Sequence, residues 1–193
     1  MGLGQTPSQT IGPFFAYGLT AEQYRYPGAQ VADGVLAGDA TPGTHIRILG
    51  RVLDGAGTPI PDALVEIWQA DAEGRHVGDM RGNTGFKGFG RQGTGIDAQA
   101  RFIFTTVKPG SVDGKQAPHI NLILFMRGLL SHVYTRIYFP DEAAANARDP
   151  VLARVPEARR HTLIAKPAGI AGERAYGFDI HMQGKDETVF FDV

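Results

Sequence analysis

The chain has 193 residues, which is enough for one domain with a sizeable core. Its 19 basic and 20 acidic residues give a formal net charge of -1, so no overall field favours nucleic acid or an anionic membrane, and neither is expected as a partner. Cysteine is absent, which excludes disulfides and thiolate metal sites.

The first segment, residues 1–43, carries glycine and proline at short intervals and no sustained hydrophobic period. We expect an extended N-terminal arm with one short helical turn near residues 20–24. Its aromatic side chains need a covering surface, which is either this domain or a partner, and the pattern leaves both open. The start lacks the basic and apolar regions of a signal peptide, so a cytoplasmic protein is expected. Met1 and Gly2 fit a myristoylation pattern only loosely, and an ordinary start is favoured.

Residues 44–193 are expected to form one domain. The 26 glycines, close to twice the usual share of about 7%, indicate many turns between short strands. Apolar residues alternate over residues 46–53, and the turn-forming residues 54–57 end this strand. Pro59 and Pro61 cannot donate backbone hydrogen bonds, so the next strand begins only at residues 63–68. We expect the two strands to form a hairpin-like pair.

The glycine-rich residues 75–99 indicate a long loop. Such a loop binds phosphate only between a strand and a helix, and no helical pattern follows it. Residues 101–107 read as a strand, and residues 119–125 and 131–139 as an antiparallel pair because their connection is short.

Apart from the short turn in the arm, helical structure is expected between residues 141 and 155. Asp141 is a candidate cap for residues 142–146, and Asp149 before Pro150 for residues 151–155. Three further strands are expected at residues 162–165, 174–183 and 188–193, the second with Tyr176, Phe178, Ile180 and Met182 on one face. Eight or nine strands without regular strand–helix alternation predict a mostly β, single-domain antiparallel β-sandwich with short helical insertions.

The sequence Trp-Gln-Ala-Asp at residues 68–71, together with the strand before it, resembles the intradiol ring-cleavage dioxygenases. Similar stretches span nearly the whole chain, at residues 6–14, 117–121, 136–139 and 187–192. The resemblance implies ferric iron held by two tyrosinates and two histidines, one pair of which is His-x-His on a strand. Hard anionic oxygens suit Fe(III), and residues two apart on a strand share one face.

The chain departs from this ligand set at three of its four positions. His119 is present, but Asn121 stands at the second histidine and Val112 at the tyrosine that follows Lys-Pro-Gly. The loop that should carry the other tyrosine, residues 75–91, has none. We therefore expect no iron in this chain, and we expect His119 to be a buried, hydrogen-bonded relic.

Other donors do not replace the missing ligands. One strand face carries His132, Tyr134, Arg136 and Tyr138, which span about 20 Å at roughly 3.3 Å per residue and cannot all reach one ion. We read that face as polar or interface-forming. The remaining histidines, His45, His76, His161 and His181, show no metal-binding spacing.

This departure resembles the iron-free chain, the α chain, of the two-chain family members. The resemblance implies a homologous iron-bearing β chain as partner in an αβ hetero-oligomer, with Fe(3+) bound by that chain. It also implies that Thr10, Gly12, Pro13 and Arg127 help to wall the partner's pocket. An arginine fork could bind the carboxylate of a small aromatic substrate whose ring is cleaved by O2 between two hydroxyl-bearing carbons.

Each of these residues also has a structural reading. Arg127 could be a solvated turn residue, and Gly12 and Pro13 could simply kink the arm. Three functions remain to be separated: the iron-free subunit, a self-contained dioxygenase with a rearranged iron site, and a non-catalytic β-sandwich binding module. The missing tyrosines favour the first.

Overall fold

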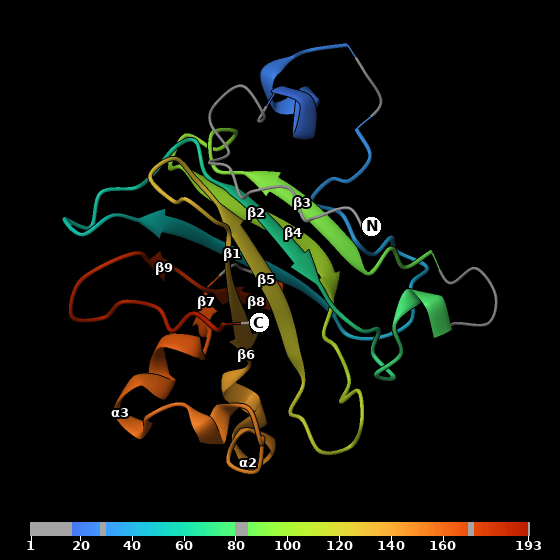
Figure 1. Cartoon of the computed structure of the whole chain (residues 1–193). Coiled ribbons are helices and arrows are strands. Elements are labelled where there is room, and N and C mark those ends of the chain that lie inside the picture. The colour runs from blue at the N-terminus through green and yellow to red at the C-terminus, as the bar shows by residue number, and fades with distance from the viewer. Residues whose placement is uncertain (1–16, 28–29, 80–84, 170–171, 193) are drawn as a thin grey trace, which may run out of the picture.

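The computed structural model describes residues 17–27, 30–79, 85–169 and 172–192. Within these residues nine strands form two facing sheets, and the helices are short (Figure 1). The strands are β1 His45–Leu53, β2 Leu64–Trp68, β3 Phe89–Gly93, β4 Arg101–Val107, β5 His119–Phe125, β6 Val133–Tyr138, β7 Lys166–Ala168, β8 Ala175–Gly177 and β9 Ile180–His181. The helices are α2 Ala143–Asn146 and α3 Glu157–Arg160, with 3-10 turns η1 Ala21–Tyr24, η2 Val77–Asp79, η3 Pro140–Glu142, η4 Leu152–Arg154 and η5 His161–Leu163.

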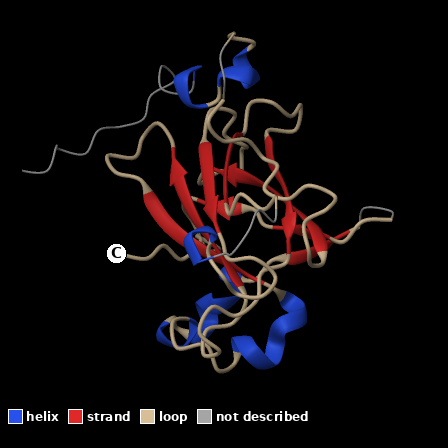
Figure 2. Ribbon diagram, turned by 90° about the vertical axis from the view of Figure 1, so that its right-hand side faces the viewer, coloured by secondary structure: helices blue, strands red, loops and turns tan. Residues whose placement is uncertain are grey.

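The first sheet has the order β4-β1-β8-β7, with β9 also beside β1, and the second has the order β3-β2-β5-β6. All pairs of the second sheet are antiparallel, but β1 pairs in parallel with β8 and β9. The mostly β sandwich is confirmed, and the first sheet is mixed rather than purely antiparallel. The short helices that follow β6 gather at one end of the sandwich (Figure 2).

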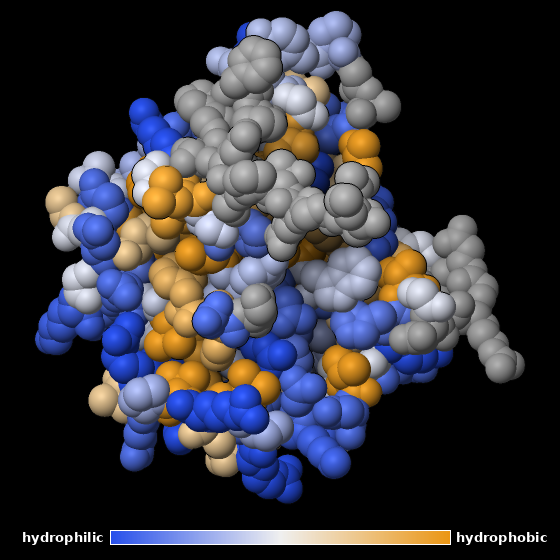
Figure 3. Space-filling view, viewed as in Figure 1, coloured by the Kyte–Doolittle hydropathy of each residue, from blue (hydrophilic) through white to orange (hydrophobic). Residues whose placement is uncertain are grey.

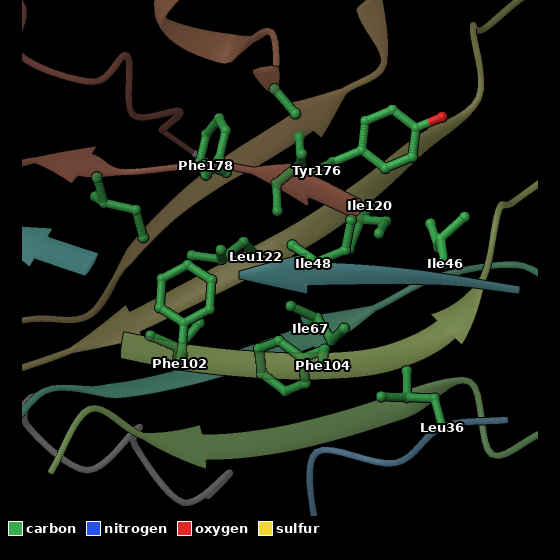
Figure 4. Packing of buried hydrophobic residues seen from close by; sticks show 14 of the residues in the cluster. Leu36, Ile46, Ile48, Ile67, Phe102, Phe104, Ile120, Leu122, Tyr176 and Phe178 are labelled. Carbon is green, nitrogen blue, oxygen red and sulfur yellow. The ribbon is translucent and has the colours of Figure 1, made fainter. Parts of the chain in front are cut away.

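The core lies between the sheets and is built by the alternation seen in the sequence. Ile48 from β1 and Phe104 from β4 pack toward Ile67 from β2 and Leu122 from β5, and all four side chains are fully buried (Figure 4). Because strand side chains alternate between faces, the odd-numbered residues of β5 point to the outer face of the second sheet. Figure 3 shows small groups of hydrophobic side chains at the surface, separated by hydrophilic ones.

The expected hairpin of residues 46–53 and 63–68 is wrong, because β1 and β2 belong to different sheets. Asp54 closes a tight turn by accepting the backbone N–H groups of Ala56 and Thr58. Thr94 then accepts from the Ala63 N–H at 3.1 Å and donates to the Ile60 carbonyl at 2.6 Å, so the chain crosses to the second sheet. Pro59 and Pro61 interrupt strand pairing, as expected, but they lie where the chain crosses from the first sheet to the second rather than in a hairpin.

The loop expected at residues 75–99 contains β3, which pairs with β2. The glycines of this segment masked its strand pattern. Gly90 is needed in the strand because Leu36 packs directly against it and leaves no space for a side chain. Leu36 is fully buried, its N–H donates to the Thr105 carbonyl at 2.8 Å, and Val35 bridges Thr105. This part of the arm therefore docks on its own domain.

Further expectations are corrected in the second half of the chain. The strand predicted at residues 174–183 is split into β8 and β9 at Asp179. The Asp179 carboxylate accepts hydrogen bonds from the backbone N–H of Arg51 at 2.9 Å and from the Arg51 guanidinium at 2.7 Å. In place of the strand predicted at residues 162–165 are the end of η5 and a single bridge between Ile164 and Tyr138, and β7 follows. The described part of residues 188–193 contributes a single bridge between Phe191 and Tyr134. Asp149 caps its turn as predicted, but Asp141 caps no helix and instead binds Lys108 Nζ at 2.8 Å.

Candidate functional site at the two ends of one strand

The predicted site residues lie at opposite ends of β5. His119 begins this strand, which is about 20 Å long at roughly 3.3 Å per residue, and Arg127 follows its last residue by two positions. Figure 1 shows the same two ends: α2 and α3 lie at one, and η1 lies at the other. The predicted arm residues Thr10, Gly12 and Pro13 lie outside the described residues.

The segments that resemble iron-ligand positions do come together at the His119 end. The Gly110 N–H donates to the Asp71 carbonyl at 2.8 Å, which joins the loop after β4 to the turn after β2. Val112 lies against Gly74 in this junction, with a side chain that is 41% exposed. The loop after β4 therefore reaches the position expected for a ligand, but Val112 has no donor atom to offer a metal.

His119 is the buried imidazole that the sequence predicted. It is 7% exposed, and its Nδ1 donates to the Ala117 carbonyl oxygen at 2.8 Å. Burial lowers the pKa of His119, and the nearby Arg136 guanidinium lowers it further. The ring is therefore neutral at pH 7, and its hydrogen bond is structural.

The positively charged Arg136 lies on β6, beside Asn121 of β5. Asn121 pairs across the sheet with Trp68 on one side and with Arg136 on the other. The Arg136 Nη1 donates to the Gln116 Oε1 at 2.8 Å and to the Tyr138 hydroxyl at 3.4 Å. A guanidinium thus lies where the family resemblance leads one to look for a metal.

Tyr138 cannot act as a tyrosinate in this setting. Its side chain is fully buried, and its hydroxyl donates to the Asp149 Oδ1 at 3.2 Å. Burial raises the pKa of Tyr138 to about 12, and the adjacent Asp149 carboxylate also raises it. The phenol stays protonated, whereas a ferric ligand would need to lose its proton.

The donor set at this end does not fit ferric iron. It offers one neutral imidazole, an amide, a guanidinium and a protonated phenol, and Fe(III) prefers anionic oxygen ligands. In the described part of the chain, no three His, Asp or Glu side chains are grouped closely enough to hold a metal ion.

The other end of β5 presents Arg127 to the outside. Its Nε lies 2.9 Å from the Asp62 Oδ2, yet its side chain is 63% exposed. Burial raises the pKa of the Tyr24 phenol, and Tyr17 and Asp62 raise it further, which places the arm's η1 close to the Asp62–Arg127 pair. One carboxylate therefore holds Arg127 in place, while most of its guanidinium group remains exposed and able to bind another group.

The strand face of β6 does not converge on one point, in agreement with its expected 20 Å span. His132 and Tyr134 hydrogen-bond to each other at 2.7 Å, while Tyr138 belongs to a small second core under the helices. The role of Asp149 beneath Tyr138 and the placement of Arg136 beside Asn121 were missed from sequence. The short connection between β5 and β6 was the available signal for Arg136, since it fixes which residues face each other.

Comparison with known proteins gives a consistent result. A family model described as Dioxygenase matches residues 21–184. The chain is 51% identical to the protocatechuate 3,4-dioxygenase alpha chain of Burkholderia cepacia over 99% of this chain and 98% of that protein. It is 37% identical to the beta chain of protocatechuate 3,4-dioxygenase from the same organism, over 76% of this chain and 67% of that one.

The fold is also found among solved structures. The dioxygenase domain of a dioxygenase and carbohydrate-binding protein fusion from Streptomyces sp. SirexAA-E is similar with a TM-score of 0.58 and 24% identity, over 92% of this chain and 97% of that one. At this identity the likeness shows the fold alone. Within the described residues, no helix combines the length and the apolar character that a bilayer-spanning segment needs.

Proposed function

The chain belongs to the intradiol ring-cleavage dioxygenases, and we propose that it is the iron-free α chain of a cytoplasmic protocatechuate 3,4-dioxygenase. Its partner in this proposal is a homologous, iron-bearing β chain, as the likeness to a beta chain supports. The two form an αβ hetero-oligomer. Residues 44–193 make the sandwich, and the arm of residues 1–43 packs partly on its own core and partly on the partner.

One observation carries this proposal: the relic metal-ligand position at His119 and the candidate substrate-binding Arg127 lie at opposite ends of β5 in the same chain. The His119 end holds a donor set unsuited to ferric iron, and Arg127 lies beyond the other end of β5, a strand about 20 Å long. Arg127 therefore cannot serve a substrate at its own His119. An exposed, anchored guanidinium beside the arm suits the pocket of a second molecule.

The proposed reaction is cleavage of protocatechuate by O2 between its two hydroxyl-bearing carbons, giving 3-carboxy-cis,cis-muconate. Ferric iron, held by the β chain, supplies the Lewis acidity that prepares the bound catecholate for O2. This chain binds and orients: Arg127 takes the substrate carboxylate, which fixes the ring. Thr10, Gly12 and Pro13 shape the pocket wall and exclude water.

Expression with and without a β chain tests the proposal. We expect the chain alone to contain no iron and to consume no O2, and the co-expressed complex to contain iron, absorb visible light and cleave protocatechuate. Iron analysis, mass determination and an oxygen-uptake assay on the same preparations provide the readout. Iron and turnover in the isolated chain would instead support a self-contained enzyme, and failure to co-purify with a β chain would support a separate binding module.

A second prediction concerns the carboxylate contact. In the αβ complex, Arg127→Ala should raise the KM for protocatechuate about tenfold or more, because a charge-assisted hydrogen bond contributes roughly 1.5–3 kcal/mol. The KM for catechol, which has no carboxylate, should change little. Steady-state oxygen uptake with both substrates measures the difference.

Arg47→Ala is the matched control for this experiment. Arg47 is also a surface arginine, with its side chain 43% exposed and one carboxylate partner, Glu173 at 3.2 Å, but it lies on β1 in the other sheet. We expect no change in either KM for this variant. An equal rise for protocatechuate and catechol in Arg127→Ala would show that the residue supports structure rather than substrate recognition.

A further inference from the structure

The outer face of the second sheet carries a cavity that the proposed reaction does not use. It has a volume of about 490 Å³, within the usual range of roughly 300–1,000 Å³ for small-molecule sites. Much of its lining is aromatic or aliphatic, from Trp68, Ile123, Tyr134 and Phe191. We propose that this cavity is a second, non-catalytic site, which binds a small aromatic carboxylate.

The charge of the cavity selects an anion. Arg136 and Arg154 both line it, and neither has a carboxylate within ion-pair distance among the described residues. Asp192, which is exposed, is the acidic residue that also contributes to the lining. Arg136 is half-buried, and its hydrogen-bond partners, the Gln116 amide and the Tyr138 hydroxyl, are neutral, so the Asp149 carboxylate reaches it only through Tyr138. A carboxylate would supply the missing partner with the bidentate geometry that a guanidinium prefers.

A larger cavity on the first sheet differs in its arginines. It measures about 680 Å³ and is lined by Arg51 and Arg101 among others. Each of these arginines already has a carboxylate: Arg51 binds Asp179 at 2.7 Å, and Arg101 binds Asp97 at 2.8 Å. The arginines of this larger cavity are therefore both paired, whereas Arg136 and Arg154 of the Trp68–Arg136 cavity are not.

The register of the sheet places a ring surface at the right distance from Arg136. Trp68 and Arg136 flank Asn121 on neighbouring strands, so their backbones lie about 10 Å apart, at roughly 4.8 Å per strand. Both side chains line the same cavity, so one ligand can contact the indole with its ring and the guanidinium with its carboxylate. His76 stacks on the Trp68 indole with centroids 5.8 Å apart and accepts its Nε1–H at 3.1 Å, so the indole is held in place while 44% exposed.

The full chain carries its own reporter, because Trp68 is its single tryptophan. We expect benzoate to quench the Trp68 fluorescence saturably, benzamide to bind at least tenfold more weakly because it lacks the charge, and acetate to do so because it lacks the ring. Arg136→Gln should weaken benzoate binding at least tenfold, and Arg136→Lys should recover part of the loss. Arg47→Gln, on the other sheet, should bind as the unsubstituted chain does.

The comparison of ligands on the unsubstituted chain keeps this test decisive even where a variant folds poorly. Equal affinities for benzoate and benzamide would overturn the proposal, as would unchanged benzoate binding in a folded Arg136→Gln protein. The proposal needs no β chain and no iron. Its failure would leave the proposed subunit function untouched, and the failure of αβ reconstitution would not affect it.

Discussion

Asp149→Ala is expected to lower the free energy of unfolding by about 3 kcal/mol or more, since it leaves several buried donors without a partner at roughly 1–3 kcal/mol each. The Asp149 side chain is fully buried. Its Oδ1 accepts the backbone N–H groups of Val151 and Leu152 at 2.8 and 2.7 Å, and its Oδ2 accepts that of Ala117 at 2.8 Å. One carboxylate thus ties the helical insertion to the chain just before β5.

Asp149→Asn separates the two oxygens. The amide oxygen can still cap Val151 and Leu152, but the amide NH2 then faces the Ala117 N–H, so two donors oppose each other. We expect a loss of about 1–3 kcal/mol, smaller than for alanine. Urea unfolding followed by circular dichroism measures both variants.

Asp113→Asn is the matched control for burial. Asp113 accepts the backbone N–H groups of Lys115 and Gln116 in the same way, but in an exposed loop where water can replace it. We expect a much smaller loss for this variant. If both asparagine variants were equally stable, burial would not be what makes the Asp149 network important.

The sequence could predict which face each residue takes more securely than which strand it pairs with. The alternation at residues 46–53 identified β1 and its buried Ile48 correctly. Periodicity of two is the same in either sheet, however, so it could not reveal that the next strand crosses over. That crossover depends on Thr94, some 30 residues away in the chain, which no local pattern reports.

The candidate site likewise has features that residue type predicts and features that depend on strand pairing. The loss of ligands at Val112 and Asn121 could be predicted because ligand chemistry depends on residue type. The cation that stands beside Asn121 could not be found by residue type alone, because it requires the pairing of β5 with β6. The separation of His119 from Arg127 follows from strand length, which the sequence indicated once β5 was recognised. The roles of Thr10, Gly12, Pro13 and Arg127 stay predictions.

Gly50→Ala is expected to destabilise the chain by about 3 kcal/mol, because overpacking against backbone leaves little room for relaxation. Gly50 lies within β1, opposite Phe102 of β4. A Cβ at this position would lie far inside the contact distance of the Phe178 carbonyl oxygen and 2.7 Å from the Phe102 Cζ. The close approach is needed because β1 pairs with β8 and then β9, and the chain between them crosses at Gly50.

The clash involves main chain, so it should disturb hydrogen bonds on both sides of Gly50. The Phe178 N–H donates to the Leu49 carbonyl at 2.8 Å, and Asp179 holds Arg51. Gly38→Ala is the control, since a Cβ there would meet nothing within 4 Å. We expect its free energy of unfolding to stay within a few tenths of a kcal/mol of that of the unsubstituted chain. A Gly50→Ala protein as stable as Gly38→Ala would mean that the segment after β8 can shift away, and that its register with β1 is not fixed by this contact.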